Sequence, residues 1–178
     1  WTLPEAGEPT GRRVLVVGMS TGAWTRALQG FPQVETIDVV EINPAYLQLI
    51  GRYESLLPAL SDPRVRIHVD DGRRWLKRHP NARFDLIVQN TTYHWRANST
   101  NVLSREYMTL VRRHLAPGGV VTMNTTGSYD VLATARASFP NAYRYANFVY
   151  ASERALAPEF SRLRGVMRPD GRAFGSAG

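Results

Sequence analysis

Cysteine is absent from this chain of 178 residues, and lysine occurs once, at Lys77. The missing thiols exclude disulfides, thiolate nucleophiles and cysteine-rich zinc sites. No apolar run approaches the roughly 18 residues that a membrane span requires, and neither a signal peptide nor an internal repeat is visible. The hydrophobic content of 43% is ordinary for a globular protein. We therefore expect a single soluble domain in the cytoplasm.

The positive charge is carried almost entirely by arginine, and the formal net charge is +7. Most arginines are scattered over predicted helices, which is typical of solvated side chains. A denser cluster spans residues 64–83, but acidic residues interleave there and no set of aromatic stacking residues accompanies it. The composition thus argues against a nucleic-acid partner. Neither His94 nor His114 has a partner at metal-ligand spacing, so we expect no metal.

Both ends of the chain differ in composition from its middle. Residues 1–11 are rich in proline, glycine and glutamate and are interpreted as a lead-in, and residues 158–178 are interpreted as a tail rich in arginine, glycine and proline. Residues 12–157 form the predicted domain. A bulky residue such as Trp1 is not expected directly after a removed initiator methionine, so we expect the chain to belong to a longer protein, with a membrane attachment through a preceding segment left open.

Apolar runs and helical periodicities alternate along the middle of the chain. The patterns predict strands at residues 12–18, 34–42, 65–69, 84–88 and 120–125. Helices are predicted at residues 24–29, 44–57, 73–79, 104–115 and 131–139, followed by two short strands within 142–151. Asn43 is the expected N-cap of the second helix, with Pro44 at its first position. Five strand-to-helix alternations predict an α/β fold, a doubly wound, Rossmann-like, mostly parallel sheet with helices on both faces. Ligands of such sheets bind beyond the carboxyl ends of the strands.

The first two strands end in residues suited to a nucleoside. Gly18, Ser20 and Gly22 follow the first strand, where glycines let the backbone approach a ligand closely, although Ser20 replaces the second glycine of a full G-x-G-x-x-G. Glu41 ends the second strand, where a carboxylate can accept both ribose hydroxyls. A plain tight turn and a solvated acid are the alternatives. The glycine turn after the first strand, combined with an acid at the end of the second strand, favours a ribose site.

The third and fourth strands also end in polar residues. Asp70, Asp71 and Gly72 follow the third strand, where one acid can accept a hydrogen bond from an adenine amino group or cap the next helix, and Asp71 can do both. The fourth strand runs into QNTTYH, residues 89–94, which offers amides, hydroxyls and an imidazole but no carboxylate. In this fold the transferred group would lie at this strand end. The fifth strand likewise ends in polar residues without acids.

Six segments within residues 12–157 resemble the nucleoside-binding domain of spermidine synthases, which share the class I S-adenosylmethionine-dependent methyltransferase fold. They are VLVVGMSTG, DVVEINPAYL, DPRVRIHVDDGRRWL, FDLIVQNTT, SREYMTLVRRHLAPGG and ANFVYASE. The resemblance implies a seven-stranded sheet ending in an antiparallel hairpin. It implies decarboxylated S-adenosylmethionine, S-adenosylmethionine or methylthioadenosine as ligand, with Glu41 on the ribose, Asp71 and Gly72 on the adenine, and the loop from Gly18 to Gly22 beside the sulfur-bearing arm.

The chain departs from that family at three places. The family's aspartate in the glycine loop is replaced at Thr21 or its neighbour, and its D-[ST]-[ST]-D-P motif reads N-T-T-Y-H, which puts Asn90 and Tyr93 in place of the two acids. Those acids hold and deprotonate the amine acceptor, and an amide cannot take up that proton. His94 is the remaining candidate base in the stretch. The family's amino-terminal β-domain, which helps to close the site and form dimers, is absent.

Three functions remain open on these residues. The first is a spermidine synthase-like transferase that alkylates a small amine-type acceptor, with Asn90, Tyr93 and His94 on the acceptor side and a homodimer as a compatible assembly. The second is a methyltransferase, because Asn90 and Tyr93 keep the ends of the [DN]-P-P-[YF] motif. The third is a catalytically inactive nucleoside-binding module, which the loss of the acids favours.

Overall fold

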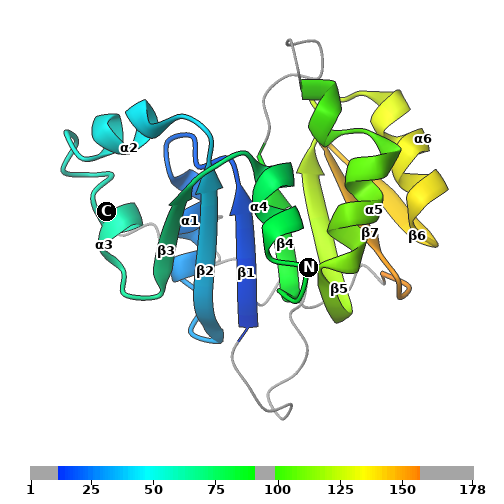
Figure 1. Cartoon of the computed structure of the whole chain (residues 1–178), viewed down its shortest axis with the longest axis horizontal. Coiled ribbons are helices and arrows are strands. Elements are labelled where there is room, and N and C mark those ends of the chain that lie inside the picture. Colours follow the sequence, from blue (N-terminus) through cyan, green and yellow to red (C-terminus); the bar gives the residue numbers. More distant parts are fainter. Residues whose placement is uncertain (1–11, 91–98, 157–178) are drawn as a thin grey trace, which may run out of the picture.

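The computed structural model describes residues 12–90 and 99–156 of the chain. These residues form a seven-stranded sheet in the order β3-β2-β1-β4-β5-β7-β6, and Figure 1 looks onto the face of this sheet, with the strands side by side and helices in front of and behind them. The strands are β1 Arg12–Val17, β2 Val34–Glu41, β3 Val65–Val69, β4 Phe84–Gln89, β5 Leu115–Asn124, β6 Asn141–Tyr145 and β7 Phe148–Ser152. Strands β1 to β5 pair in parallel, whereas β7 is antiparallel to both β5 and β6. The predicted fold class and the terminal hairpin are confirmed.

Helices cover both faces of the sheet. They are α1 Ala23–Gln29, α2 Pro44–Ile50, α3 Pro58–Ser61, α4 Gly72–Arg78, α5 Arg105–Arg113 and α6 Tyr129–Ser138, with a short 3-10 helix, η1, at Ser99–Val102. One core cluster joins α4, α5 and α6 to the sheet, and a second joins α1, α2 and α3 to the opposite face. The central strands are therefore buried on both sides, which explains why their sequences are continuous apolar runs rather than alternating ones.

The predicted helix over residues 44–57 begins where expected but is wrong in its length. Helix α2 ends at Ile50, Gly51 caps it, and the chain passes through turns before α3 begins at Pro58. Asn43 caps α2 as expected, since its side chain accepts a hydrogen bond from the Ala45 amide at 3.0 Å. The apolar side chains beyond Ile50 that suggested a longer helix are not all buried: Tyr53 is 54% exposed. The apolar residues beyond Ile50 are spaced as in a helix, but they do not form one helix face packed against the core.

The fifth strand begins earlier than predicted. The predicted strand covers residues 120–125, whereas β5 starts at Leu115 and includes Pro117, Gly118 and Gly119. Its pairing with β4 shifts register between Phe84 and Leu86, as in a β-bulge. A Cβ atom on Gly119 would lie 2.8 Å from the Phe84 carbonyl oxygen. The glycine thus permits the close approach of the two strands rather than only ending the preceding helix.

None of the helices in residues 12–90 and 99–156 is long and apolar enough to cross a membrane. The predicted lead-in of residues 1–11 and the predicted tail of residues 158–178 lie outside the described residues.

Candidate nucleoside site at the carboxyl edge of the sheet

The backbone brings the predicted site residues together at one edge of the sheet. The Gly18 amide donates to the Val40 carbonyl at 2.9 Å, and the Asn90 amide donates to the Val17 carbonyl at 3.0 Å. On the other side of β2, the Asp70 amide donates to the Glu41 carbonyl at 3.2 Å. These bonds continue the parallel ladders past the last paired residues. The ends of β1, β2, β3 and β4 therefore form one continuous edge.

The glycine loop is required by packing as well as by any ligand. Gly18 has φ +87°, and a Cβ atom there would lie 2.8 Å from the Asn90 carbonyl oxygen. Gly22 has φ +81°, and its Cβ would lie 2.8 Å from that of Ala59 in α3. Ser20, between them, also has a positive φ of 52°. The turn fits closely between β4 and α3, a constraint that the sequence alone did not reveal.

Glu41 lies under this loop and is 4% exposed. Its Oε2 accepts a hydrogen bond from the Met19 amide at 2.7 Å, and its Oε1 accepts one from the Asn43 amide at 2.8 Å. The carboxylate therefore joins the glycine loop to the start of α2. Each carboxylate oxygen can accept more than one hydrogen bond, so these contacts leave acceptor capacity for ribose hydroxyls.

Asp71 caps α4, because its Oδ1 accepts a hydrogen bond from the Arg74 amide at 2.9 Å. The capping alternative considered for Asp71 is thus confirmed, and its proposed contact with adenine stays a prediction. Gly72 follows in the first turn, and a Cβ atom there would lie 2.7 Å from Val17 Cγ1. Gly72 lets α4 approach β1, which brings Asp71 close to the end of β1.

Asp70 is held by two arginines of α4. Arg74 Nε donates to its Oδ1, and Arg78 Nη1 donates to its Oδ2 at 3.2 Å. Desolvation raises the pKa of the Asp70 carboxyl, but the hydrogen bonds from Arg74 and the Asp71 amide outweigh it, so the net shift is downward. Asp70 thus stays ionised, and its two oxygens are occupied by these two arginines.

Two neighbouring residues at the end of β4 differ in role: Gln89 supports the fold, and Asn90 is a candidate acceptor-side residue. Gln89 is fully buried, and its Nε2 donates to the Val102 carbonyl at 2.7 Å, which fixes η1 against the strand. Asn90 is partly exposed. Tyr93 and His94, together with the two threonines before them, lie outside the described residues. The acceptor-side roles of Asn90, Tyr93 and His94 stay predictions.

The polar residues after β5 form a turn of their own. Asn124 Oδ1 accepts a hydrogen bond from the Thr126 amide at 3.1 Å, and Thr125 Oγ1 donates to the Asn147 carbonyl at 3.0 Å. Thr125 is fully buried, so its hydroxyl connects this turn to the hairpin between β6 and β7. These hydrogen bonds account for the polar character of this strand end.

The described part of the chain contains no group of three or more histidine, aspartate or glutamate side chains placed to hold a metal ion. Its histidines make structural contacts. His68 Nε2 lies 2.8 Å from Asp38 Oδ1, and the buried His114 places Nδ1 2.8 Å from the Leu110 carbonyl and Nε2 3.1 Å from the Leu76 carbonyl. His114 therefore has a structural role, because its ring connects the end of α5 to α4.

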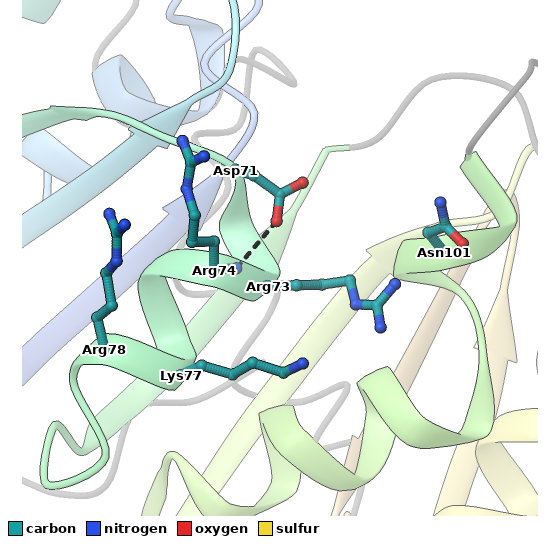
Figure 2. Close-up of a pocket in the computed structure, with 6 residues that line it drawn as sticks. All are labelled: Asp71, Arg73, Arg74, Lys77, Arg78 and Asn101. Atoms are coloured by element: carbon teal, nitrogen blue, oxygen red, sulfur yellow. Dashed lines mark hydrogen bonds between the residues drawn. The ribbon is translucent and has the colours of Figure 1, made fainter.

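An open hollow of about 350 Å³ lies beside Asp71. Figure 2 shows it between α4 and η1, with basic side chains of α4 on one side and Asn101 on the other. It is lined by Asp71, Arg73, Arg74, Lys77, Arg78 and Asn101. The sequence showed the basic cluster, but not that η1 lies opposite it, because that proximity depends on the fold.

A doubly wound sheet with this strand order, closed by an antiparallel hairpin, defines the class I methyltransferase-like fold, and solved structures agree. A spermidine synthase in complex with the transition state analogue AdoDATO superimposes with a TM-score of 0.73 at 18% identity, over 82% of this chain and 56% of the other. Human methyltransferase-like protein 13 in complex with SAH gives a TM-score of 0.67 at 22% identity, over 84% and 74% of the two chains. At these identities the likeness establishes the fold.

Sequence relatives establish the family. Residues 2–152 match the spermine/spermidine synthase domain. Spermidine synthase 2 of Hyoscyamus niger is 26% identical in an alignment of 152 residues that covers 81% of this chain and 49% of that protein. Polyamine aminopropyltransferase 2 of Ralstonia nicotianae is 28% identical in an alignment of 173 residues that covers 91% of this chain and 32% of that protein. The chain belongs to the spermine/spermidine synthase family, and it spans about half or less of the length of these relatives.

Proposed function

We propose that this chain is the nucleoside-binding part of a transferase that takes S-adenosylmethionine or its decarboxylated form and alkylates a small amine-type acceptor. The observation that carries the proposal is the meeting of Gly18, Glu41, Asp71 and Asn90 at one edge of the sheet in a member of the spermine/spermidine synthase family. A relative named as a polyamine aminopropyltransferase and a solved spermidine synthase with a bound AdoDATO support the ligand class.

The roles at the nucleoside side follow from charge and hydrogen bonding. Glu41 is an acceptor placed at the loop between β1 and α1, which suits two ribose hydroxyls. Asp71 uses Oδ1 as a helix cap, and its second oxygen can accept from an adenine amino group. The loop from Gly18 to Gly22 is the predicted neighbour of the sulfonium arm.

The reaction forms a carbon–nitrogen bond between the acceptor amine and the transferred carbon. The carbon–sulfur bond breaks, and its electron pair stays on sulfur, which leaves methylthioadenosine after aminopropyl transfer or S-adenosylhomocysteine after methyl transfer. The acceptor nitrogen must lose one proton. Asn90 can orient the amine through its amide oxygen, but it cannot take up that proton at neutral pH.

The proton therefore needs another acceptor. His94 is our candidate for the base, because imidazole is the side chain in residues 89–94 whose ordinary pKa lies near neutrality. If the amine instead binds after losing its proton to water, the rate of the enzyme will follow the neutral fraction of the acceptor. A His94→Gln variant separates these two routes through its pH–rate profile.

Calorimetry with S-adenosylmethionine, decarboxylated S-adenosylmethionine and methylthioadenosine tests the nucleoside site. Binding of at least one is expected, and Glu41→Gln should weaken it by about tenfold or more, since a lost hydrogen bond to a charged group costs about 1.5–3 kcal/mol. The exposed Glu54→Gln is the matched control. No binding heat with any of the three ligands, from protein with a native circular dichroism spectrum, would contradict the proposal.

Methyl transfer is the second candidate, favoured by Asn90 at the position of the first residue of the [DN]-P-P-[YF] motif. The same titrations separate it from aminopropyl transfer, because a methyltransferase should bind S-adenosylmethionine more tightly than its decarboxylated form. Binding without turnover of any amine tested would instead identify a nucleoside-binding module.

A further inference from the structure

The basic hollow beside α4 has an asymmetric set of charges. Arg73 and Lys77 are four residues apart and so lie on one side of the helix, and Figure 2 shows both extending toward η1 and α5, with Asn101 facing Arg73. Arg74 and Arg78 line the hollow too, but extend along a different side of α4. The two pairs therefore face different surroundings.

Arg74 and Arg78 already share an acidic partner, Asp70. Both donate hydrogen bonds to Asp70, and Arg74 also contributes its backbone amide to Asp71. Arg73 and Lys77, by contrast, make no ion pair with another residue of 12–90 or 99–156. Their two positive charges are available to a ligand that enters the hollow.

Glu106, at the start of α5, is the nearby acid that could compete for Arg73. Its pKa is lowered mainly by its own backbone amide and the Ser104 hydroxyl, and Arg73 contributes a smaller part through its charge. No salt bridge joins the side chains of Arg73 and Glu106 among the described residues. Glu106 therefore leaves the guanidinium of Arg73 open to another oxyanion.

We propose that Arg73, Lys77 and Asn101 form a subsite for an oxyanion, a phosphate or carboxylate group, next to Asp71. A guanidinium can bind two oxygens of such a group side by side, an ammonium adds a compact positive charge, and the Asn101 amide supplies a neutral donor from the opposite wall. The subsite binds the anion whether or not the neighbouring edge binds an adenosyl ligand, so it goes beyond the proposed function.

The position of Asp71 sets where the anion can lie. Its carboxylate lines the same hollow at the start of α4, and it repels an anion from that end. The anion is thus held toward Arg73 and Lys77. It can arrive as a free ion or as a group carried on a nucleoside that lies across Asp71, and these two sources share the same chemistry at the subsite.

The test is titration of the purified chain with inorganic phosphate and with acetate at constant ionic strength, followed by amide NMR shifts. Saturable shifts centred on α4 and η1 are expected. The double variant Arg73→Gln/Lys77→Gln should weaken binding by about tenfold, which equals about 1.4 kcal/mol. The double variant Arg26→Gln/Arg136→Gln removes the same formal charge from exposed positions of α1 and α6, and it should bind as the parent does.

Comparison of adenosine with adenosine monophosphate separates the two sources of the anion. A gain in affinity from the phosphate that disappears in Arg73→Gln/Lys77→Gln identifies a nucleoside-borne group, and equal affinities identify a free ion. Equal loss of phosphate binding in both double variants would overturn the proposal, because binding would then follow net charge. Unsaturable binding, or tight binding restricted to long polyanions such as an oligonucleotide, would overturn it as well. Phosphate binding without any adenosyl binding would leave the subsite intact and remove the proposed function.

Discussion

Glu41 Oε2 accepts a hydrogen bond from the backbone amide of Met19 at 2.7 Å, so the acid at the end of β2 holds the glycine loop that follows β1. Removal of this buried carboxylate in Glu41→Ala leaves two amides without their acceptor. We expect a loss of about 2–4 kcal/mol in the free energy of unfolding, since each unsatisfied buried amide costs about 1–3 kcal/mol. Urea denaturation measures it.

Glu41→Gln is the informative companion to that variant. It keeps the volume and one carbonyl oxygen, so it should recover at least half of the lost stability while still weakening the binding of an adenosyl ligand. Glu54→Ala, at an exposed position, should change the free energy of unfolding by less than about 0.5 kcal/mol. A fully stable Glu41→Ala would show that the loop does not depend on this carboxylate.

A second prediction concerns Gly18. An alanine there must adopt φ +87° and place its Cβ 2.8 Å from the Asn90 carbonyl oxygen. We expect Gly18→Ala to lower the free energy of unfolding by about 2 kcal/mol or more, from the left-handed conformation and from displacement of the β4 end.

Gly51→Ala is the matched control for that glycine. Gly51 has φ −62°, and its Cβ would lie 3.5 Å from the Leu47 carbonyl oxygen, an ordinary contact. The substitution should stabilise the chain by about 0.4–1 kcal/mol through the unfolded state. Similar losses in both variants would show that general sensitivity of the chain, rather than the fit of the loop, decides the result.

A third prediction concerns the acceptor side. Asn90→Asp combined with Tyr93→Asp restores the two acids of the spermidine synthase motif. We expect measurable aminopropyl transfer from decarboxylated S-adenosylmethionine to putrescine, at least about tenfold above the parent chain, because a carboxylate attracts the ammonium and accepts its proton. Product formation is followed by mass spectrometry of spermidine.

The single variants serve as controls in that experiment. Asn90→Asp alone should recover part of the activity, and Tyr93→Asp alone should recover less, because the first acid is the one replaced at the strand end. Unchanged activity in the double variant, with methylthioadenosine still bound, would mean that the missing acids do not limit the reaction.

A fourth prediction uses Tyr107, which is buried in α5 and whose hydroxyl has no hydrogen-bond partner within the described ranges. Desolvation, assisted by the charge of Asp71, raises the pKa of its phenol above the ordinary value of about 10. The folded phenol therefore stays neutral when the unfolded one ionises. Its contribution to stability is complete below about pH 10 and is lost as the pH rises further.

Tyr107→Phe should remove the loss of unfolding free energy that the buried phenol causes above about pH 10. Its unfolding free energy at neutral pH should equal the parent's or exceed it by up to about 1 kcal/mol, and the advantage should grow between pH 10 and 11.5. Denaturation at a series of pH values measures the difference. The exposed Tyr53→Phe should keep the parent's alkaline slope, and an identical slope for Tyr107→Phe would refute the assignment.

The sequence predicted those parts of the fold that local chemistry determines. The run at residues 12–18 is apolar because β1 is covered on both faces, and Asn43 and Asp71 cap the helices that follow them. The hairpin within residues 142–151 was also predictable, although its turn is made by Ala146, with φ +50°, and Asn147 rather than by glycine.

Tertiary contacts decided what the sequence could not predict. Helix α2 stops at Ile50, and Tyr53 beyond it is exposed. Strand β5 extends back to Leu115 through a glycine that faces β4. The sequence placed Gln89 in a candidate binding site, yet its buried amide donates a hydrogen bond to η1 and holds it against β4. Such roles depend on partners 13 or more residues away, which no local pattern encodes.

The close approach of Gly18 to the Asn90 carbonyl has a consequence for how this family can change its chemistry. The contact is made by main-chain atoms on both sides, so it does not depend on which side chain occupies position 90. An aspartate, an asparagine or another residue can stand there while the glycine loop keeps its shape. Under the proposed function, acceptor preference can therefore diverge by single substitutions at this strand end, without a compensating change in the loop that we propose as the neighbour of the adenosyl ligand.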